Sequence, residues 1–228
     1  MHLREASRTS VKLDVSGGVA SRAYSSVSVG MSIMNRKSLS LCLYVVVAAI
    51  LSGEMILETP RLILRPFREE DLDLLAPLTA NPDFMRSSLG IYSREQTAAF
   101  LDKVINWQHR GPPSQFAVVH RADNRLIGYC GFLHQQVDAT DEIEIAYRLD
   151  PDYWSRGLAT EAVTAVRDRA FRNLKLTRVI SLIHPDNLPS RRVAEKNGMK
   201  IEKKTVFRGF PTLVFVITRE EWPAAHGA

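Results

Sequence analysis

The stretch Tyr153-Trp154-Ser155-Arg156-Gly157-Leu158-Ala159-Thr160-Glu161-Ala162 joins two segments whose hydrophobic periods differ. Before it, residues 142–149 alternate charged or polar side chains with apolar ones, which is the period of a β-strand, and Asp150-Pro151-Asp152 ends that strand. After it, apolar residues recur at steps of three and four from Ala159 to Leu174, as on the buried face of a helix. The stretch is therefore predicted to be a strand-to-helix turn.

The start of the predicted helix suits a bound anion. The first backbone N–H groups of a helix have no partner inside it, and the helix dipole adds partial positive charge at that end. Gly157 and Ala159 let the backbone approach a ligand closely, and Arg156 contributes a full charge. We interpret the turn as a seat for a pyrophosphate group. A plain tight turn is the alternative, because this signal alone is weak.

Two other nucleotide-binding motifs are absent from the sequence. No G-x-x-x-x-G-K-S/T motif occurs, which excludes a P-loop. No G-x-G-x-x-G follows a predicted strand, so a Rossmann site for a nicotinamide or flavin dinucleotide is unsupported. A pyrophosphate at this turn would therefore be bound without either device.

Composition sets the class of protein. The 228 residues, 45% hydrophobic and 24% charged, suffice for one globular domain with an extension. The net charge of +5 is only mildly basic, and Lys and Arg are scattered along the chain, which argues against nucleic acid as the main ligand. Cys42 and Cys130 are far apart and form no CxxC motif, so neither a zinc site nor a disulfide is indicated. We expect a cytoplasmic protein, with Cys130 in its core.

Residues 1–54 differ in composition from the rest of the chain, being rich in Ser, Val and Gly. The apolar run Leu39–Leu51 is similar to the core of a signal peptide and too short for a membrane span, which needs about 20 residues. More than thirty residues precede it, which argues against export. We expect 1–54 to be a disordered extension or a misassigned start, 55–222 the domain and 223–228 a tail. A signal or anchor beginning at Met31 or Met34, or an ordered extra element, remains open.

The remaining segments predict a mixed α/β fold. Glu69 to Asp71 open a helix that Pro77 ends or kinks, and Ser93 with Gln96 has the spacing of a capping box. Further strands are expected at 59–66, 115–120, 126–133, 178–183, 204–208 and 213–218, the last two flanking a turn at 209–211. A short helix is expected at 189–198. The order implies a three-layer α+β arrangement with helices on both faces of a mostly antiparallel sheet and one parallel crossover.

Several spaced motifs together resemble one family. Asp150–Ala162, Asn187-x-x-Ser190 and Glu195–Met199 are similar to the motifs of the GNAT superfamily of acyl-CoA-dependent N-acetyltransferases, and closest to its ribosomal-protein N-terminal acetyltransferase branch. The resemblance covers nearly all of residues 55–222. The superfamily turn pattern is Gln/Arg-x-x-Gly-x-Gly/Ala, and the first position here is Trp154. The branch usually has Trp there, followed by a run such as Ala159–Ala162.

The resemblance implies acetyl-CoA as co-substrate and no metal. It also implies which residues hold coenzyme A. Backbone groups of the turn would hold the pyrophosphate: Arg156, Gly157, Leu158, Ala159 and Thr160. The pantetheine arm would pair like an extra strand with Tyr147, Arg148 and Leu149, and would also touch Asn187.

An amine attacks a thioester only when neutral, so the reaction needs a base, a donor for the oxyanion and an acid for the leaving thiolate. Glu144 matches the strand carboxylate of the family and is the candidate base, acting through water. Glu142 lies on the same strand face and is the second choice. The alternative is that both carboxylates only solvate the strand. The oxyanion donor would be a backbone N–H near Tyr147.

The candidate acid is Ser190. Many members of the superfamily place a Tyr seven residues after the helix Asn, but that position here is Ala194. The ribosomal-protein branch is thought to use the serine of Asn-x-x-Ser instead. The alternative is that Ser190 merely caps its helix.

The resemblance implies direct transfer within a ternary complex to a primary amine, either a protein N-terminus or a small molecule. We expect a monomer or homodimer with no nucleic-acid or membrane partner, and His134 and His184 lack the spaced partners of a metal site. A non-catalytic acyl-CoA or peptide-binding module is the alternative function. In the helices that shape the acceptor pocket of this family, core packing is the favoured role for Phe84, Tyr92 and Trp107, whereas Arg86 and His109 could meet an acidic acceptor.

Overall fold

The computed structural model describes residues 56–86, 88, 90–108 and 114–222. The predicted extension, its apolar run Leu39–Leu51, residue His109 and the tail 223–228 lie outside the described residues, so the predicted domain limits stay predictions. Within the described residues, no helix has the length and apolar character needed to cross a membrane.

An eight-stranded sheet in the order β1-β2-β3-β4-β5-β6-β8-β7 forms the centre of the domain. Neighbouring strands pair antiparallel except β5 and β6, which are parallel. The predicted fold class is thereby confirmed, including the single parallel crossover. The strands are β1 (Leu57–Glu58), β2 (Leu62–Arg65), β3 (Gln115–His120), β4 (Arg125–Val137), β5 (Thr140–Leu149), β6 (Arg178–Ile183), β7 (Lys200–Phe207) and β8 (Phe210–Thr218).

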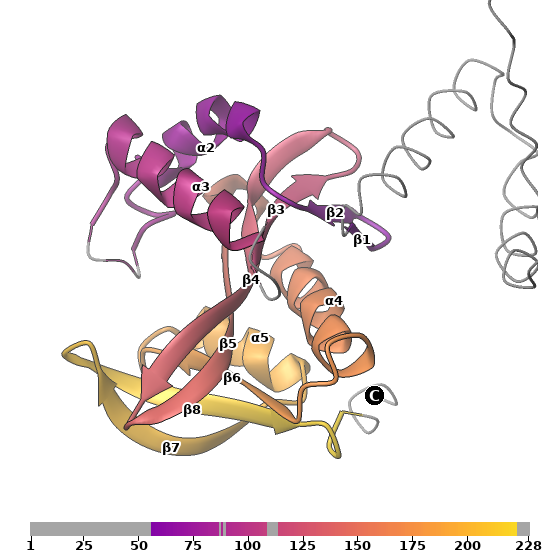
Figure 1. The fold of residues 1–228 in the computed structure, drawn as a ribbon, viewed down its shortest axis with the longest axis vertical. Helices are drawn as coiled ribbons and strands as arrows, with labels where there is room; N and C mark the ends of the chain where they lie inside the picture. The colour runs from indigo at the N-terminus through magenta and orange to yellow at the C-terminus, as the bar shows by residue number, and fades with distance from the viewer. Residues whose placement is uncertain (1–55, 87, 89, 109–113, 223–228) are drawn as a thin grey trace, which may run out of the picture. The chain divides into compact units, whose positions relative to one another are not determined.

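Helices cover both faces of this sheet. The helices are α2 (Leu72–Thr79), α3 (Arg94–Gln108), α4 (Leu158–Arg172) and α5 (Leu188–Lys196). Figure 1 shows α2 and α3 together on one side of the central strands and α4 on the other. Two separate cores correspond to these layers, one containing residues of α2 and α3 and the other residues of α4 and α5.

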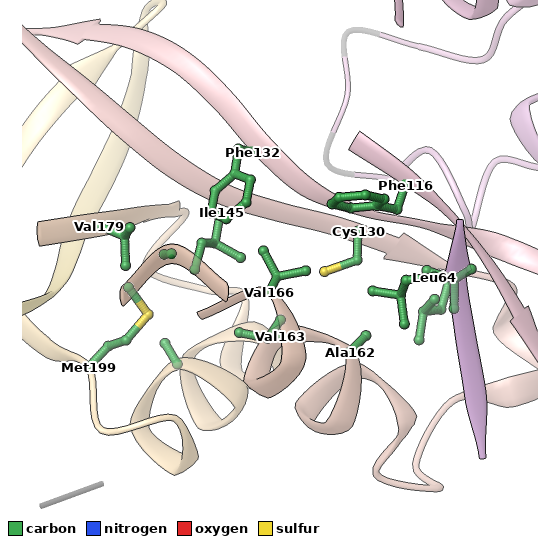
Figure 2. Close-up of a cluster of buried hydrophobic side chains, with 14 of the residues drawn as sticks. Leu64, Phe116, Cys130, Phe132, Ile145, Ala162, Val163, Val166, Val179 and Met199 are labelled. Carbon is green, nitrogen blue, oxygen red and sulfur yellow. The ribbon is translucent and has the colours of Figure 1, made fainter. Parts of the chain in front are cut away.

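The α4 core holds the helix that follows the predicted turn. Ala162, Val163 and Val166 project from α4 toward Cys130 and Ile145 on β4 and β5 (Figure 2), and all five are buried. Burying a Val or Ile side chain stabilises the fold by roughly 1.5–3 kcal/mol. The apolar stripe therefore fixes the rotation of α4, and with it the place where the helix begins.

The α2–α3 core is rich in aromatic rings. Phe84 is buried and meets Tyr129 edge-on, with 5.8 Å between ring centroids, and Tyr129 also contacts Phe100. Tyr92 packs beside Phe100. Phe84 and Tyr92 thus have the core-packing role that the sequence favoured, while Trp107 is half-buried next to His134.

Local signals were mostly correct. The capping box is present, because the Ser93 N–H donates to Gln96 Oε1 (2.8 Å) and the Gln96 N–H donates to Ser93 Oγ (3.2 Å). Pro77 does not end its helix, which continues to Thr79 and carries Pro77 in its last turn.

The turn predicted at 209–211 is present, but its bounds are wrong, and Gly209 alone belongs to both the predicted and the observed turn. β7 and β8 are joined by Arg208 and Gly209 alone, with φ of 52° and 84°, and Phe207 pairs with Phe210. A two-residue hairpin turn in which both residues have positive φ matches the twist of the flanking strands. Pro211 sits inside β8 because β6 pairs with β8 only from Leu213 onward, which leaves the edge beside Pro211 unpaired by β6.

Candidate active site

The strands β5 and β6 part from each other beside the predicted site. Their parallel ladder has one registered pair, Glu144 with Ile180. Beyond Ile145, β5 continues to Leu149 with an edge that no described strand pairs on the β6 side. An unpaired edge presents backbone donors and acceptors to whatever lies beside it. The opening between β5 and β6 is therefore able to accept an extended ligand.

Side chains replace backbone hydrogen bonds where the two strands part. The Ser181 hydroxyl on β6 donates to the Ile145 carbonyl on β5 at 2.8 Å. In the other direction, the Leu182 N–H on β6 donates to Glu144 Oε1 at 3.4 Å. Glu144 thus lies at the narrow end of the opening, and its side chain links β5 to β6 there.

Glu144 is a buried carboxylate, with 8% of its surface exposed. Its Oε2 accepts a hydrogen bond of 2.7 Å from the side-chain amide of Gln135 on β4. Burial raises the pKa of Glu144, because a charged carboxylate loses its hydration there. The two hydrogen bonds and the charges of Arg208 and Arg148 offset part of that rise. A carboxyl with a raised pKa is suited to accept a proton near neutral pH.

Glu142 has a different environment on the same strand face. Its carboxylate forms an ion pair with Arg178 on β6 at 2.9 Å, and Arg178 also contacts Glu202 at 3.0 Å. The Glu142 carboxylate is thus held by a guanidinium, whereas Glu144 is held by an amide and a backbone N–H.

The predicted strand-to-helix turn is present. A short 3-10 turn over Pro151–Tyr153 leads through an exposed segment to Gly157, which is the N-cap of α4 with φ of 78°. Glycine reaches that backbone conformation without the strain that a side chain adds, and Ser155 in the same turn also has a positive φ, of 59°. Gly157 has no side chain that could cap the helix. The backbone N–H groups of Leu158, Ala159 and Thr160 also have no acceptor within the helix.

The side chains of the turn point to different places. Leu158 is buried in the core, so only its backbone can face a ligand. Arg156 is exposed, and its guanidinium lies 5.2 Å from the centre of the Tyr153 ring. Trp154 donates through its indole N–H to the Leu149 carbonyl at 2.7 Å. The last residue of β5 and the turn are thus joined directly.

Glu161, in the first turn of α4, ties this turn to the strand pair β1–β2. Its carboxylate accepts from the Thr59 hydroxyl (2.6 Å), the Arg61 N–H (2.9 Å) and the Arg61 guanidinium (2.7 Å). The same guanidinium donates to the Arg156 carbonyl at 2.8 Å. Burial acts to raise the pKa of Glu161, but these hydrogen bonds outweigh it and leave the pKa lowered. We call this set of contacts the Glu161 anchor.

Ser190 and Asn187 meet at the start of α5. Asn187 is the N-cap, and its Oδ1 accepts from the Ser190 N–H at 3.2 Å. The Ser190 hydroxyl accepts from the Tyr147 hydroxyl at 3.1 Å. Burial raises the pKa of Tyr147 to about 12, so the phenol stays protonated and can donate. Asn187, not Ser190, supplies the side-chain cap of this helix.

The predicted residues therefore lie on two faces of β5. Tyr147 packs against the α4 core and meets Ser190, whereas Arg148 reaches the other layer and donates to the Phe84 carbonyl at 3.2 Å. Glu144 lies on the same face as Arg148, because side chains four apart on a strand share a face. Glu144 and Ser190 consequently approach the β5–β6 opening from opposite sides. Ala194 is buried in the core.

Other candidate residues have structural contacts. Cys130 is fully buried and burial raises its pKa, which suits core packing and not a nucleophile. His184 lies 3.7 Å from Asp186 at the surface. Among the described residues, no group of three His, Cys, Asp or Glu side chains is placed to hold a metal ion. The Arg86 guanidinium stacks on Trp154 at 4.5 Å.

Sequence reasoning missed the roles of three contributors to the site. Gln135 and Arg208 lie on segments outside the motifs, and polar residues near strand ends carry no signal of their own. Arg61 lies in the opening run Glu58–Arg65, which is part of the family resemblance, but no role was predicted for it. Glu161 belongs to the recognised Ala-Thr-Glu-Ala run, and its position in that run was the one available clue.

Comparison with known proteins identifies the family. Residues 61–200, more than half of the chain, match the acetyltransferase (GNAT) domain. The uncharacterized N-acetyltransferase YnaD of Bacillus subtilis is 30% identical over 176 residues, which is 74% of this chain and 99% of YnaD. A GNAT-family acetyltransferase from Bacillus anthracis superimposes with a TM-score of 0.63 at 28% identity, covering 73% of this chain and all of that one.

Ribosomal-protein acetyltransferases also share the fold. RimL, a ribosomal L7/L12 alpha-N-protein acetyltransferase solved in complex with coenzyme A, superimposes with a TM-score of 0.62 at 20% identity, over 72% of this chain and 98% of RimL. The chain therefore belongs to the GNAT family of acetyltransferases and is an acetyl-CoA-dependent acyltransferase.

Proposed function

We propose that this enzyme transfers the acetyl group of acetyl-CoA to the primary amine of a protein N-terminus or a small molecule, by direct attack within a ternary complex. The observation that carries the proposal is Glu144: a buried carboxylate with a raised pKa, at the point where β5 and β6 part. The mechanism assigns one role to each group around that opening.

Acetyl-CoA would be held by backbone groups at two places. The uncapped N–H groups of Leu158, Ala159 and Thr160 suit a pyrophosphate, which carries negative charge and several acceptor oxygens. The free edge of β5 from Tyr147 to Leu149 suits the amide groups of a pantetheine arm, which can pair like a strand. Asn187 caps the start of α5, and Ser190 in the same turn is hydrogen-bonded to Tyr147 on this strand edge.

Glu144 would act as the general base. The attacking amine must lose a proton, and a carboxylate whose pKa is raised above its ordinary value is a better acceptor for it. Because the side chain is buried, we infer that a water molecule carries the proton from the amine to Glu144. The Glu144 carboxylate, which ends the step protonated, loses its charge in a site where charge is costly.

Ser190 would assist the leaving thiolate. As the new N–C bond forms and the C–S bond breaks, the sulfur leaves as a thiolate, and the Ser190 hydroxyl is free to donate a hydrogen bond to it because it accepts from Tyr147. Full protonation of the sulfur through Ser190 would return the proton to Ser190 from the Tyr147 hydroxyl and solvent. A backbone N–H near Tyr147 would stabilise the oxyanion. Base and acid would thus work from opposite faces of β5.

The acceptor is a primary amine, and the name of RimL, an α-N-protein acetyltransferase, supports a protein N-terminus. The test uses the full-length protein with acetyl-CoA and measures thiol release with a panel of amines. The panel pairs each peptide with a copy whose N-terminus is blocked, and adds amino acids and polyamines. A peptide acceptor predicts release with the free N-terminus only.

Two outcomes would contradict the proposal. Initial rates measured while varying both substrates should give intersecting double-reciprocal lines, as a ternary complex requires, and parallel lines would exclude direct transfer. Failure of the folded protein to bind coenzyme A in calorimetry would exclude the assigned turn and strand edge.

A further inference from the structure

We propose that Gln135 is a positioning residue for Glu144, and that Arg208, at the tip of the β7–β8 hairpin, holds the Gln135 amide in the orientation this requires. The inference rests on the proposed role of Glu144 as base. It goes beyond that role because it assigns the control of the base to two residues outside every motif of the sequence.

Gln135 shares a sheet face with Glu144. In the β4–β5 register, Gln135 is opposite Glu142 and Leu133 is opposite Glu144, so Gln135 and Glu144 are diagonal neighbours within reach of long side chains. The Gln135 Nε2 donates to Glu144 Oε2 at 2.7 Å. This is the shorter of the two hydrogen bonds on the carboxylate, since the Leu182 N–H is 3.4 Å away.

Arg208 determines which end of the Gln135 amide faces the carboxylate. Its Nη2 donates to Gln135 Oε1 at 3.2 Å. A guanidinium can only donate and a carboxylate can only accept, so a group between them must accept at one end and donate at the other. An amide does both. The amide oxygen must therefore face Arg208, and the amide NH₂ must face Glu144.

The remaining groups that face Glu144 cannot replace Gln135. Glu142, on the same strand, is paired with Arg178 of β6, and Arg148, also on β5, is directed to the Phe84 carbonyl. Leu182 supplies one long hydrogen bond from β6. Without Gln135, the buried carboxylate would lose its short donor and would be harder to ionise.

The hairpin places Arg208 for this task. Arg208 and Gly209 form the two-residue turn, and the Arg208 guanidinium lies over the Phe207 ring at 5.0 Å. Arg208 is exposed, so its charge reaches the site from the solvent side. The link between Arg208 and Gln135 spans 73 positions of sequence, which ties the last hairpin of the chain to the base.

The experiment measures kcat/KM against pH for the full-length enzyme with its best amine. Gln135→Leu should move the acid limb of the profile up by about one pH unit, so that activity on that limb falls about tenfold and recovers at high pH. Arg208→Ala should move the limb in the same direction by less, because the amide keeps its place but can flip. Gln135→Asn, whose amide is one methylene shorter, should resemble Gln135→Leu and serves if that variant does not fold.

The matched control is Gln136→Leu. Gln136 is the next residue of the same strand, is exposed and points to the opposite face, so its profile should overlay that of the wild type. In a Glu144→Gln background, Gln135→Leu should have no further effect on the profile.

The two levels of proposal can fail separately. If Glu144→Gln abolishes turnover while Gln135→Leu and Gln135→Asn leave the acid limb in place, the positioning role is wrong and the base stands. If Glu144→Gln keeps the wild-type rate and profile, the base assignment fails and the role of Gln135 falls with it. Equal shifts for Gln135→Leu and Gln136→Leu would also overturn the inference.

Discussion

The turn before α4 and the surroundings of Glu144 are two halves of one site, but they are built differently. The turn offers backbone N–H groups at an exposed helix start, and one glycine with φ of 78° permits its shape. Glu144 is a buried side chain whose hydrogen-bond partners come from β4 and β6, and the β7–β8 hairpin contacts its partner Gln135. Binding of the coenzyme thus depends on local backbone, whereas the proposed chemistry depends on distant side chains.

This difference has an electrostatic reason. A helix start carries its partial charge wherever the helix is placed, and so needs little from the rest of the protein. The properties of a buried carboxylate depend on its surroundings, because every nearby donor and charge changes its pKa. Changes at the turn should therefore alter affinity, and changes around Glu144 should alter rate and its pH dependence.

The sharpest test of this division is Glu144→Gln. The change removes the proton acceptor and keeps the shape of the side chain, although the amide can accept only one of the two hydrogen bonds that the carboxylate accepts. We expect kcat/KM to fall by about 100-fold or more. The Kd for coenzyme A in calorimetry should stay within about twofold. Glu142→Gln is the matched control and should keep a nearly normal rate, because Glu142 is already committed to Arg178. Equal losses of rate and coenzyme affinity in Glu144→Gln would contradict the division.

At the turn, Gly157→Ala should weaken coenzyme A binding by about tenfold. A side chain in this left-handed conformation costs roughly 1–2 kcal/mol, and relief of the strain would displace the N–H groups of α4. Gly209→Ala is the control, since Gly209 has φ of 84° and a methyl group added there would meet nothing within 4 Å, so it carries the same strain away from the turn. Loss of affinity in both variants would mean that global stability, not the turn, sets the Kd.

The Glu161 anchor should have a smaller effect on the same measurement. Glu161→Ala removes the acceptor for Thr59 and Arg61 and frees the guanidinium that holds the Arg156 carbonyl, so we expect the Kd for coenzyme A to rise about fivefold. Arg94→Ala breaks the exposed ion pair with Asp73 away from the site and should leave the Kd unchanged. An unchanged Kd in Glu161→Ala would show that the turn keeps its shape without the anchor.

The smallest expected effect is on stability. The pKa of Glu144 is raised in the folded state, so the folded protein binds its proton more tightly than the unfolded chain, and ionisation costs stability as pH rises above the ordinary Glu value of about 4.3. The stability of Glu144→Gln relative to the wild type should therefore increase as the pH rises from 5 to 8. Glu142→Gln should lose about 0.5–1 kcal/mol by breaking its pair with Arg178. The melting temperature of Glu144→Gln minus that of the wild type should be larger at pH 8 than at pH 5, whereas the difference for Glu142→Gln should be negative at both. An equal difference for Glu144→Gln at the two pH values would refute the raised pKa.

Much of the fold could be predicted because the hydrophobic periodicity of short segments indicates their secondary structure. The alternation in β5 and the three- and four-residue steps of α4 are properties of short segments, and the capping box at Ser93 needs only four residues. The final hairpin turn was misplaced because Pro211 suggests a turn. Its tolerance inside β8 depends on where β6 stops pairing, which no local pattern reports.

The candidate site divides in the same way. The sequence by itself determined the strand-turn-helix unit around Gly157, since the hydrophobic periods on either side change there, glycine permits a positive φ, and every helix start leaves N–H groups without an acceptor inside the helix. It also pointed to Glu144, Asn187 and Ser190 through a family resemblance, without their environments.

Only the tertiary structure decided how those residues are used. It buried Glu144 and left Glu142 in an ion pair, although both lie on one strand face with the same chemistry. It brought the Tyr147 hydroxyl to Ser190 across 43 positions and the Arg61 guanidinium to Glu161 across 100. The physical reason is that desolvation and hydrogen bonding act over a few ångströms of space, and distance along the chain does not reveal which side chains come that close.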